Sequence, residues 1–394
     1  MNTETQKAFA SLTGDSLLSL DSYRRFIDHY ATVVFGLDEK IFSKINAEFL
    51  RRTSETKLDD LNAAEMAEIV RLYKNELAQR RLVIPEDPYE QLRESVNAVY
   101  RSWYDEKAVH FRTAMKISEH WGTAVLLMNM IPGNRKGSGA SVFFTRKPSS
   151  LEKGVYGDTK ETATGDDLVY GKLINRPLAK AQVLQGQRSL EEEDPVLFAM
   201  HEELAAEIES AMGGLPQEVE ATYVAGPEGK RIIYVLQTRR MEFHRGFIKH
   251  FQDICMMESN IIGRGVGVHG GALSGIATFS ASPDRIDSIK KETGMPVILL
   301  RKSSSTNDVS LMSHIDGIVT SAGGATSHAA ILAQKFGLTA VVGCSDMEIS
   351  IDEKGESFAR IGNYPVTEAT SISIDGSTGL VYSGICEFTT ETRQ

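Results

Sequence analysis

In the first third of the chain, apolar residues recur at intervals of three and four among charged ones, the spacing of an amphipathic helix. The pattern predicts helices over 39–52, 58–82 and 89–103, and prolines at 85 and 88 separate the second from the third. The stripe predicted to be buried on the second helix consists of Leu61, Ala64, Ala67 or Glu68, Ile69, Leu72 and Leu77. We expect these helices to serve packing.

Beyond Trp121 the pattern changes from helical to strand-like. A nearly continuous apolar run over 123–131 and a second over 140–145 predict strands separated by a turn-rich segment. Two further runs, 219–224 and 231–237, flank a Gly-Pro-Glu-Gly turn and predict a hairpin. The stretch between Arg240 and Ser259 has few turn signals and predicts an interdomain helix or linker.

From Ile261 onward, short β-like runs alternate with helical segments and glycines. The runs cover 297–300, 317–320, 340–342, 372–374 and 380–382. This alternation predicts a compact α/β domain of about 130 residues.

Composition narrows the class of protein. The 394 residues carry 43 Lys and Arg against 53 Asp and Glu, and this balance argues against a protein built mainly to bind nucleic acid or an anionic membrane. No run of about 18 apolar residues is present, and the N-terminal sequence lacks the pattern of a signal peptide. Cys255, Cys344 and Cys386 are too widely spaced for a disulfide framework or a metal motif. We therefore expect a cytoplasmic protein.

The segment 320–344 is the strongest candidate for chemistry. A strand ends at Thr320, Gly323 and Gly324 form a bend, and a helix begins near His328. The first turn of a helix offers free N–H groups and a positive dipole end, which suit a phosphoryl group. The same dipole favours a neutral, nucleophilic imidazole. The hydroxyls of Thr326 and Ser327 are placed to bind the ring or the phosphate.

Other interpretations of His328 stay open at this point. A histidine at a helix start often only neighbours the cap, and the Ser-His pair lacks a third member of a catalytic triad. His269 and His314 do not provide regular metal-ligand spacing with His328.

The sequence GGATSHAAILAQKFGLTAVVGC resembles the phosphohistidine signature of the phosphoenolpyruvate-utilising enzymes, most of all that of the pyruvate, phosphate dikinase family. The glycines over 265–275 and the segment 374–384 are similar to the opening and end of that family's swivelling β/β/α domain. The resemblance implies that His328 is transiently phosphorylated.

Upstream blocks also resemble this family's ATP-grasp domain; they cover 21–37, 101–112, 121–134, 138–157 and 235–240. The resemblance implies that Glu220 and Gln237 hold Mg²⁺ and that Arg239 contacts the phosphates of ATP, the substrate. Gln237 and Arg239, two apart on a predicted strand, face the same side, where Glu220 of the partner strand can meet them. Weaker candidates for outer-shell or ribose contacts are Glu218 and Asp166 or Asp167.

Together these patterns predict an α/β (α+β) fold, with an incomplete ATP-grasp domain over 1–240, a linker over 241–260 and a phosphohistidine domain over 261–394. Compared with the family, the expected phosphate-binding lysine lobe and the pyruvate barrel are missing, and Met128 stands where the family usually has Gln. We therefore expect one chain of a split dikinase-like phosphotransferase, whose missing lobe and phosphoenolpyruvate/pyruvate domain come from separate chains. The alternatives are a non-catalytic pseudoenzyme or phosphocarrier that binds partners, and a phosphotransferase with another acceptor.

Overall fold

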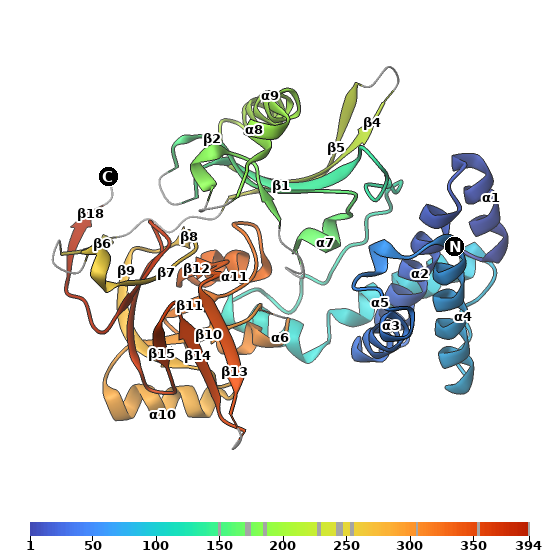
Figure 1. The fold of residues 1–394 in the computed structure, drawn as a ribbon. Helices are drawn as coiled ribbons and strands as arrows, with labels where there is room; N and C mark the ends of the chain where they lie inside the picture. The colour runs from blue at the N-terminus through green and yellow to red at the C-terminus, as the bar shows by residue number, and fades with distance from the viewer. Residues whose placement is uncertain are drawn as a thin grey trace. The chain divides into compact units, whose positions relative to one another are not determined.

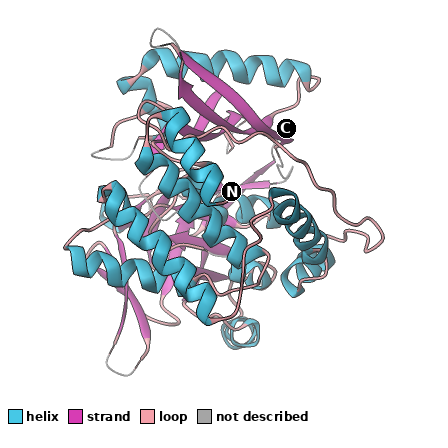
Figure 2. Ribbon diagram, turned by 90° about the vertical axis from the view of Figure 1, so that its right-hand side faces the viewer, coloured by secondary structure: helices cyan, strands magenta, loops and turns pink. Residues whose placement is uncertain are grey.

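A computed structural model describes residues 1–148, 151–169, 175–183, 187–226, 230–241, 247–252, 256–304, 306–352 and 355–392. By its internal contacts the chain divides into two compact units, Met1–Asn129 and Met130–Gln394. All described strands belong to the second unit (Figures 1 and 2). The domain boundaries expected at 240 and 260 stay predictions.

The first unit is helical. Its elements are α1 Thr3–Thr13, α2 Ser16–Val33, α3 Lys40–Thr53, the short 3-10 helix η1 Leu58–Asp60, α4 Ala63–Gln79, α5 Pro88–Ser102 and α6 Glu106–Ala114. The three predicted helices are confirmed as α3, α4 and α5. Asn62 caps α4 by accepting from the backbone of Glu65, and Asp87 caps α5 ahead of a proline in its first turn.

The buried face of α4 differs from the predicted stripe. The core takes Met66, Ile69, Val70, Tyr73 and Leu77 from this helix. The predicted Ala64 and Ala67 are exposed and Leu72 is only half-buried. The larger side chains of Met66 and Tyr73 bury more apolar surface than the alanines, and they set which face turns inward.

A five-stranded antiparallel sheet forms the first part of the second unit, in the order β3-β2-β1-β4-β5. Its strands are β1 Gly139–Arg146, β2 Lys153–Glu161, β3 Arg176–Pro177, β4 Gln217–Ala225 and β5 Arg231–Arg240. The hairpin predicted from 219–237 is confirmed as β4 and β5, although residues 227–229 of its turn lie outside the described residues. Nearby helices are α7 Gly165–Val169, η2 Lys180–Gln182, α8 Leu190–Glu193 and α9 Pro195–Ala211.

An eight-stranded sheet follows, in the order β7-β17-β16-β9-β10-β11-β12-β8, with β9 to β12 parallel. Its strands are β7 Ile261–Arg264, β8 Val266–His269, β9 Ala272–Thr278, β10 Val297–Arg301, β11 Gly317–Thr320, β12 Thr339–Val342, β16 Ser371–Asp375 and β17 Leu380–Ser383. The five strands predicted after residue 296 are confirmed. The short 3-10 helices η4 Glu258–Asn260 and η5 Thr306–Leu311 lie in its connections.

Each face of the eight-stranded sheet has its own apolar core. On one face, Ile286 of α10 (Pro283–Thr293) and Leu332 of α11 (His328–Phe336) pack with Val297 and Leu299. On the other, Ile298 and Leu300 pack against a small sheet of β13 Met347–Ile351, β14 Ser357–Ile361 and β15 Tyr364–Val366. Alternation along each strand supplies both cores. The layers are helix, sheet and sheet, so the mixed α/β fold and its β/β/α part are confirmed (Figure 1).

Two predictions about local structure are wrong. The apolar run 123–131 forms no strand among the described residues. The sequence predicts an interdomain helix or linker after Arg240, and the helix is wrong: β6 (Phe247–Phe251) pairs antiparallel with β18 (Phe388–Thr392). The linker over 241–260 stays a prediction. Phe251 packs beside Ala272, Tyr382 and Cys386, and this burial fixes the strand.

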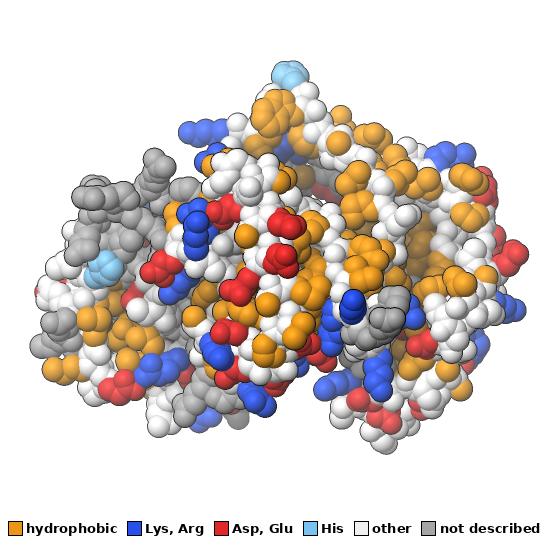
Figure 3. Space-filling model, turned by 90° about the horizontal axis from the view of Figure 1, so that it is seen from above, with side chains coloured by type: hydrophobic (Ala, Val, Ile, Leu, Met, Phe, Trp, Pro, Cys, Tyr) orange, Lys and Arg blue, Asp and Glu red, His pale blue; other side chains and the backbone are white. Residues whose placement is uncertain are grey.

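None of the helices in the described ranges is long and apolar enough to cross a membrane. Acidic and basic side chains are interspersed on the face drawn in Figure 3, so the net charge of −10 is not gathered into one patch there. Cys344 and Cys386 are buried free thiols, and Cys255 lies outside the described residues.

Candidate functional site

The five-stranded sheet packs one face against α9, and its other face, called the polar face below, carries polar side chains beside the buried Ala140 and Val142. Phe143, Val219 and Tyr223 share a core with Leu197 and Ala205 of α9. Because side chains alternate along a strand, the neighbouring positions point to the opposite face. The predicted residues Glu220, Gln237 and Arg239 therefore all lie on the face away from α9.

Strand register places the polar residues in two rows. In the first row, Asp158 on β2 pairs with Val142, Val142 with Glu220, and Glu220 with Gln237. In the second, Glu218 lies opposite Arg239. Directly paired residues of antiparallel strands point to the same face, with Cβ atoms about 5 Å apart. The structure thus brings Glu220 and Gln237 together, as their spacing predicted.

The histidine loop lies at the start of α11. Ser327 caps the helix by accepting from the backbone N–H of Ala330, and Gly337 ends it with a left-handed backbone, as predicted. His328 is half-buried in the first turn, and its Nε2 atom is inaccessible to solvent. Gly323 has a φ of 103°, and a Cβ there would lie 2.8 Å from the Ser327 Cβ. The bend therefore depends on glycine.

Asp158 joins the sheet to this loop. Its Oδ2 accepts hydrogen bonds from the Thr326 backbone N–H at 3.1 Å and from the Thr326 hydroxyl at 2.8 Å. A Cβ on Gly324 would stand 2.2 Å from the same oxygen, so only glycine admits the carboxylate. The anion at this glycine bend is thus the Asp158 side chain of the protein itself. It binds Thr326, two residues before His328.

Burial changes the acidity of this carboxyl group. Asp158 is only 4% exposed, and burial raises its pKa to about 6, although the two hydrogen bonds from Thr326 act in the opposite direction. The start of α11 contributes a positive dipole end, which favours a carboxylate there. Near neutral pH, the contact therefore joins an ionised carboxylate to donors of the histidine loop.

A small cavity lies between the polar face and α11. It has a volume of about 280 Å³ and is lined by Glu218, Arg239, Arg240, Ile331, Gln334 and Lys335. Arg239 donates to Glu218 through Nε at 2.8 Å and forms an ion pair with it. Three of the six lining side chains are cationic and one is anionic, so the cavity suits an anionic group.

Several side chains make contacts other than those expected from the sequence. The Thr326 and Ser327 hydroxyls, expected to bind the ring or a phosphate, bond to Asp158 and to the Ala330 N–H respectively. Glu218 is buried and paired with Arg239. Asp167 accepts from Thr164, which fixes the start of α7, and the Asp166 side chain lies outside the described residues.

Asp158 is the residue that sequence reasoning missed. It is a carboxylate in the middle of an otherwise buried strand, which is an unusual position and a usable signal. Its partner lies 168 residues away in sequence, at Thr326. Only the strand register and the docking of the loop reveal that contact.

The side-chain oxygens of Glu220 and Gln237 are of the type that Mg²⁺ prefers. Among the described residues there is no group of three His, Cys, Asp or Glu side chains placed to hold a metal ion. Mg²⁺ in nucleotide sites needs only one or two protein oxygens, because phosphate oxygens and waters complete its octahedron. The paired oxygens of Glu220 and Gln237 fit such a site, and the nucleotide would supply the rest.

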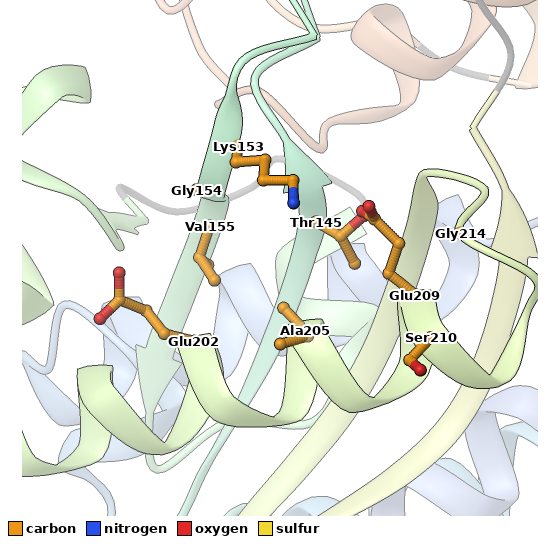
Figure 4. A pocket seen from close by; sticks show the side chains of 10 residues that line it. Thr145, Lys153, Gly154, Val155, Glu202, Ala205, Glu209, Ser210 and Gly214 are labelled. Carbon is orange, nitrogen blue, oxygen red and sulfur yellow. The ribbon is translucent and has the colours of Figure 1, made fainter.

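A larger hollow of about 500 Å³ lies on the other face of the sheet, beside α9 (Figure 4). Thr145, Lys153 and Val155 line it from the sheet, and Glu202 and Glu209 line it from the helix. Glu209 is held by Thr145 and Arg146. None of the predicted site residues lines this hollow, so it is separate from the polar face.

Two family models match separate segments of the chain. Residues 61–178 match the pyruvate phosphate dikinase AMP/ATP-binding domain, and residues 294–379 match the PEP-utilising enzyme mobile domain. The chain is 31% identical over 423 residues to a pyruvate, phosphate dikinase of Clostridium symbiosum, covering 98% of this chain and 46% of the relative. The chain is 30% identical to the corresponding enzyme of Rhizobium meliloti and covers 45% of its length. The chloroplastic enzyme of Flaveria bidentis is 31% identical and is covered over 42%.

The fold and both matches therefore define a protein that combines an AMP/ATP-binding domain with a phosphoenolpyruvate-utilising mobile domain. The chain resembles the pyruvate, phosphate dikinases in both of these domains and is about 30% identical to them over 98% of its length. It spans about half the length of the curated relatives it matches.

Proposed function

We propose that this chain is a dikinase-type phosphotransferase component that takes a phosphoryl group from ATP onto His328 and passes it to an acceptor. One observation carries the proposal: the sheet face that holds Glu220, Gln237 and Arg239 also holds Asp158, whose carboxylate binds the loop of His328. The names of the relatives support pyruvate as the acceptor.

In the proposed transfer, a ring nitrogen of His328 forms a bond to the β-phosphorus of ATP while the bond from that phosphorus to the AMP oxygen breaks, and AMP leaves with the electron pair of that bond. The histidine then carries a pyrophosphoryl group. Transfer of its terminal phosphoryl group to inorganic phosphate or water breaks the bridging P–O bond and leaves one phosphoryl group on His328. Arg239 would neutralise charge on the phosphates, and Glu220 and Gln237 would hold Mg²⁺, which supplies further charge neutralisation when bound. Asp158 would position the loop over the polar face. The phosphorylated domain would then carry the group to a second site.

Separate chains that supply a further nucleotide-binding lobe and the acceptor domain are part of this proposal. It is tested by asking whether the 394-residue polypeptide is labelled by ATP alone or only in a complex recovered from its host.

The central experiment uses ATP labelled at the β-phosphorus. We expect acid-labile, base-stable label on the chain, complete loss of label in His328→Ala, and retention in His120→Ala, an exposed histidine of the first unit. Label that persists in His328→Ala contradicts the assignment of His328. If no label forms with recovered partners present, the phosphotransferase proposal fails.

A non-catalytic role is the second candidate, and the Asp158 contact favours it. Both hydroxyls beside His328 are already used within the protein, and an internal carboxylate occupies donors at the glycine bend. A module of this kind would bind partners without transferring phosphate. Absence of label together with a stable complex would select this candidate.

A further inference from the structure

Lys335 lies on the helix that begins with His328, and it lines the small cavity beside the polar face. From α11 this cavity is lined by Ile331, Gln334 and Lys335, and from the sheet by Glu218, Arg239 and Arg240. Its volume of about 280 Å³ is close to the lower end of the range for ligand sites. The cavity therefore suits a phosphate group better than a whole nucleotide.

His328, Ile331 and Lys335 share one face of α11. Ile331 follows His328 by three residues and Lys335 follows it by seven, which completes almost two helical turns. The helix rises by about 10 Å between His328 and Lys335. Since Ile331 and Lys335 line the cavity, the face of α11 that carries the histidine is turned toward the polar face of the sheet.

Contacts near the two ends of α11 show how this helix runs over the sheet. Asp158 of β2 binds Thr326, just before the helix, and Arg239 of β5 shares the cavity with Lys335 in the last turn. Strands β2 and β5 are three strand spacings apart, about 14 Å. The helix therefore crosses the sheet from β2 toward β5, and His328 and Lys335 stand at successive points of this crossing.

The charges around the cavity favour an anion. Arg239 donates from Nε to Glu218 at 2.8 Å, and the charges of this ion pair cancel. Arg240 and Lys335 add two positive charges to the lining, and Lys335 is half-buried. Like charges brought together on two facing elements repel each other, and a phosphate oxyanion between them replaces this repulsion with attraction.

We propose that Lys335 is a phosphate-binding residue, which acts from the helix of His328 and faces Arg239 on the sheet. This inference rests on the proposed function. A phosphate group in the cavity accepts hydrogen bonds from the Lys335 ammonium on one side and from the Arg239 guanidinium on the other. The helix thus carries both the nucleophile and a cation for the phosphates. Two sources have this chemistry: a phosphate of ATP that does not bond to His328, and free inorganic phosphate.

The first experiment measures phosphate binding without requiring transfer. Inorganic tripolyphosphate with Mg²⁺ is titrated into the full chain in a calorimeter. We expect Lys335→Gln to weaken binding by about 10- to 100-fold, because a charge-assisted hydrogen bond is lost. Lys335→Arg should restore the affinity to within about threefold, since it keeps the charge.

The control for this titration is Lys291→Gln. Lys291 is an exposed lysine in the last turn of α10, the position that Lys335 has in α11, so this variant should bind tripolyphosphate as the parent does. Equal affinity in Lys335→Gln and the parent, or no binding to the parent, would overturn the proposal. A loss that Lys335→Arg does not restore would do the same, because it would show that the charge is not the cause.

The second experiment identifies which phosphate the cavity holds. Labelling by ATP is followed in a single turnover without inorganic phosphate, and pyrophosphate formation is followed as inorganic phosphate is added. If the group belongs to ATP, Lys335→Gln lowers the labelling rate by about 10- to 100-fold. If it is free phosphate, labelling is unchanged and the phosphate concentration for half-maximal pyrophosphate formation rises by about 10- to 100-fold. A variant that matches the parent in both arms contradicts the proposal.

Together the two experiments separate this inference from the proposed function. Tripolyphosphate binding that depends on Lys335, in a chain that is never labelled, leaves the phosphate-binding residue in place and removes the phosphotransferase proposal. Normal labelling with tripolyphosphate binding that is independent of Lys335 does the reverse.

Discussion

The two faces of the five-stranded sheet differ in what their side chains meet. The face toward α9 carries Phe143, Val219 and Tyr223 in a dry core. The opposite face carries Asp158, Glu220 and Gln237 in one cross-strand row that also contains the buried Val142. Adjacent residues of the same strand, such as Val219 and Glu220, thus belong to different environments. The period-two alternation of a strand lets one sheet build stability on one face and chemistry on the other.

This difference predicts that substitutions on the α9 face change stability and that substitutions on the polar face change function. The largest change in the free energy of unfolding is expected for Phe143→Ala. Phe143 is fully buried and its ring meets His201 edge-on at 5.3 Å, so truncation leaves a cavity and should lower the free energy of unfolding by about 3–5 kcal/mol. Urea unfolding measures this free energy. The matched control is Phe358→Ala: Phe358 is 38% exposed, so its truncation should lower the free energy of unfolding far less. Equal losses in the two variants would contradict the two-face interpretation.

Asp158→Asn tests the buried carboxylate that contacts the histidine loop. An acid whose pKa is raised from 3.8 to about 6 on folding binds more protons in the folded state, so its contribution to stability falls as pH rises from about 4 to 6. At pH 7 the variant should be more stable than the parent by up to about 3 kcal/mol, and the gain should vanish below pH 4. Thermal unfolding across this pH range measures it. A gain that does not depend on pH would show that the charge of Asp158 is not the cause.

His201 gives the opposite pH dependence on the α9 face. Its ring is buried between the Leu197 carbonyl and the Ser141 hydroxyl, and burial lowers its pKa. The unfolded chain takes up the proton near pH 6.5 and the folded chain resists it, so stability falls as pH drops below 6.5. The free energy of unfolding of His201→Gln should be about 1–3 kcal/mol lower than that of the parent at pH 8, and it should fall less steeply as the pH drops. Urea titrations at several pH values measure both effects. A steeper acid loss in the variant would contradict the assignment.

The smallest change in stability is expected for Glu220→Gln. Glu220 is half-buried on the polar face, and the variant should unfold within about 1 kcal/mol of the parent. If the proposed Mg²⁺ site is correct, label transfer from ATP should nevertheless fall by about 100-fold, since a metal-ligand charge is lost. The exposed Glu203→Gln on α9 should change neither quantity. Normal labelling in Glu220→Gln would remove Glu220 from the site.

Local sequence predicted much of the fold and part of the site. The bounds of α11, its Gly337 cap and the β4–β5 hairpin follow from short-range signals, and so does the meeting of Glu220 with Gln237. Contacts between segments far apart in the sequence were not predictable. The run 123–131 and strand β1 are both apolar, yet only β1 has neighbours on both sides. Likewise, the strand at 247–251 depends on a partner near the C-terminus, and the contact of Asp158 with Thr326 depends on how two sheets meet.

The pairing of β6 with β18 has a consequence for protein engineering. Phe247 lies opposite Thr392, so the polypeptide enters and leaves the eight-stranded region at neighbouring points, about 5 Å apart. A few residues of glycine-rich linker would join these two points, and new termini could then be opened in the exposed turn between β14 and β15. The eight-stranded region is therefore a natural candidate for circular permutation, and any tag fused after Thr392 would emerge beside Phe247.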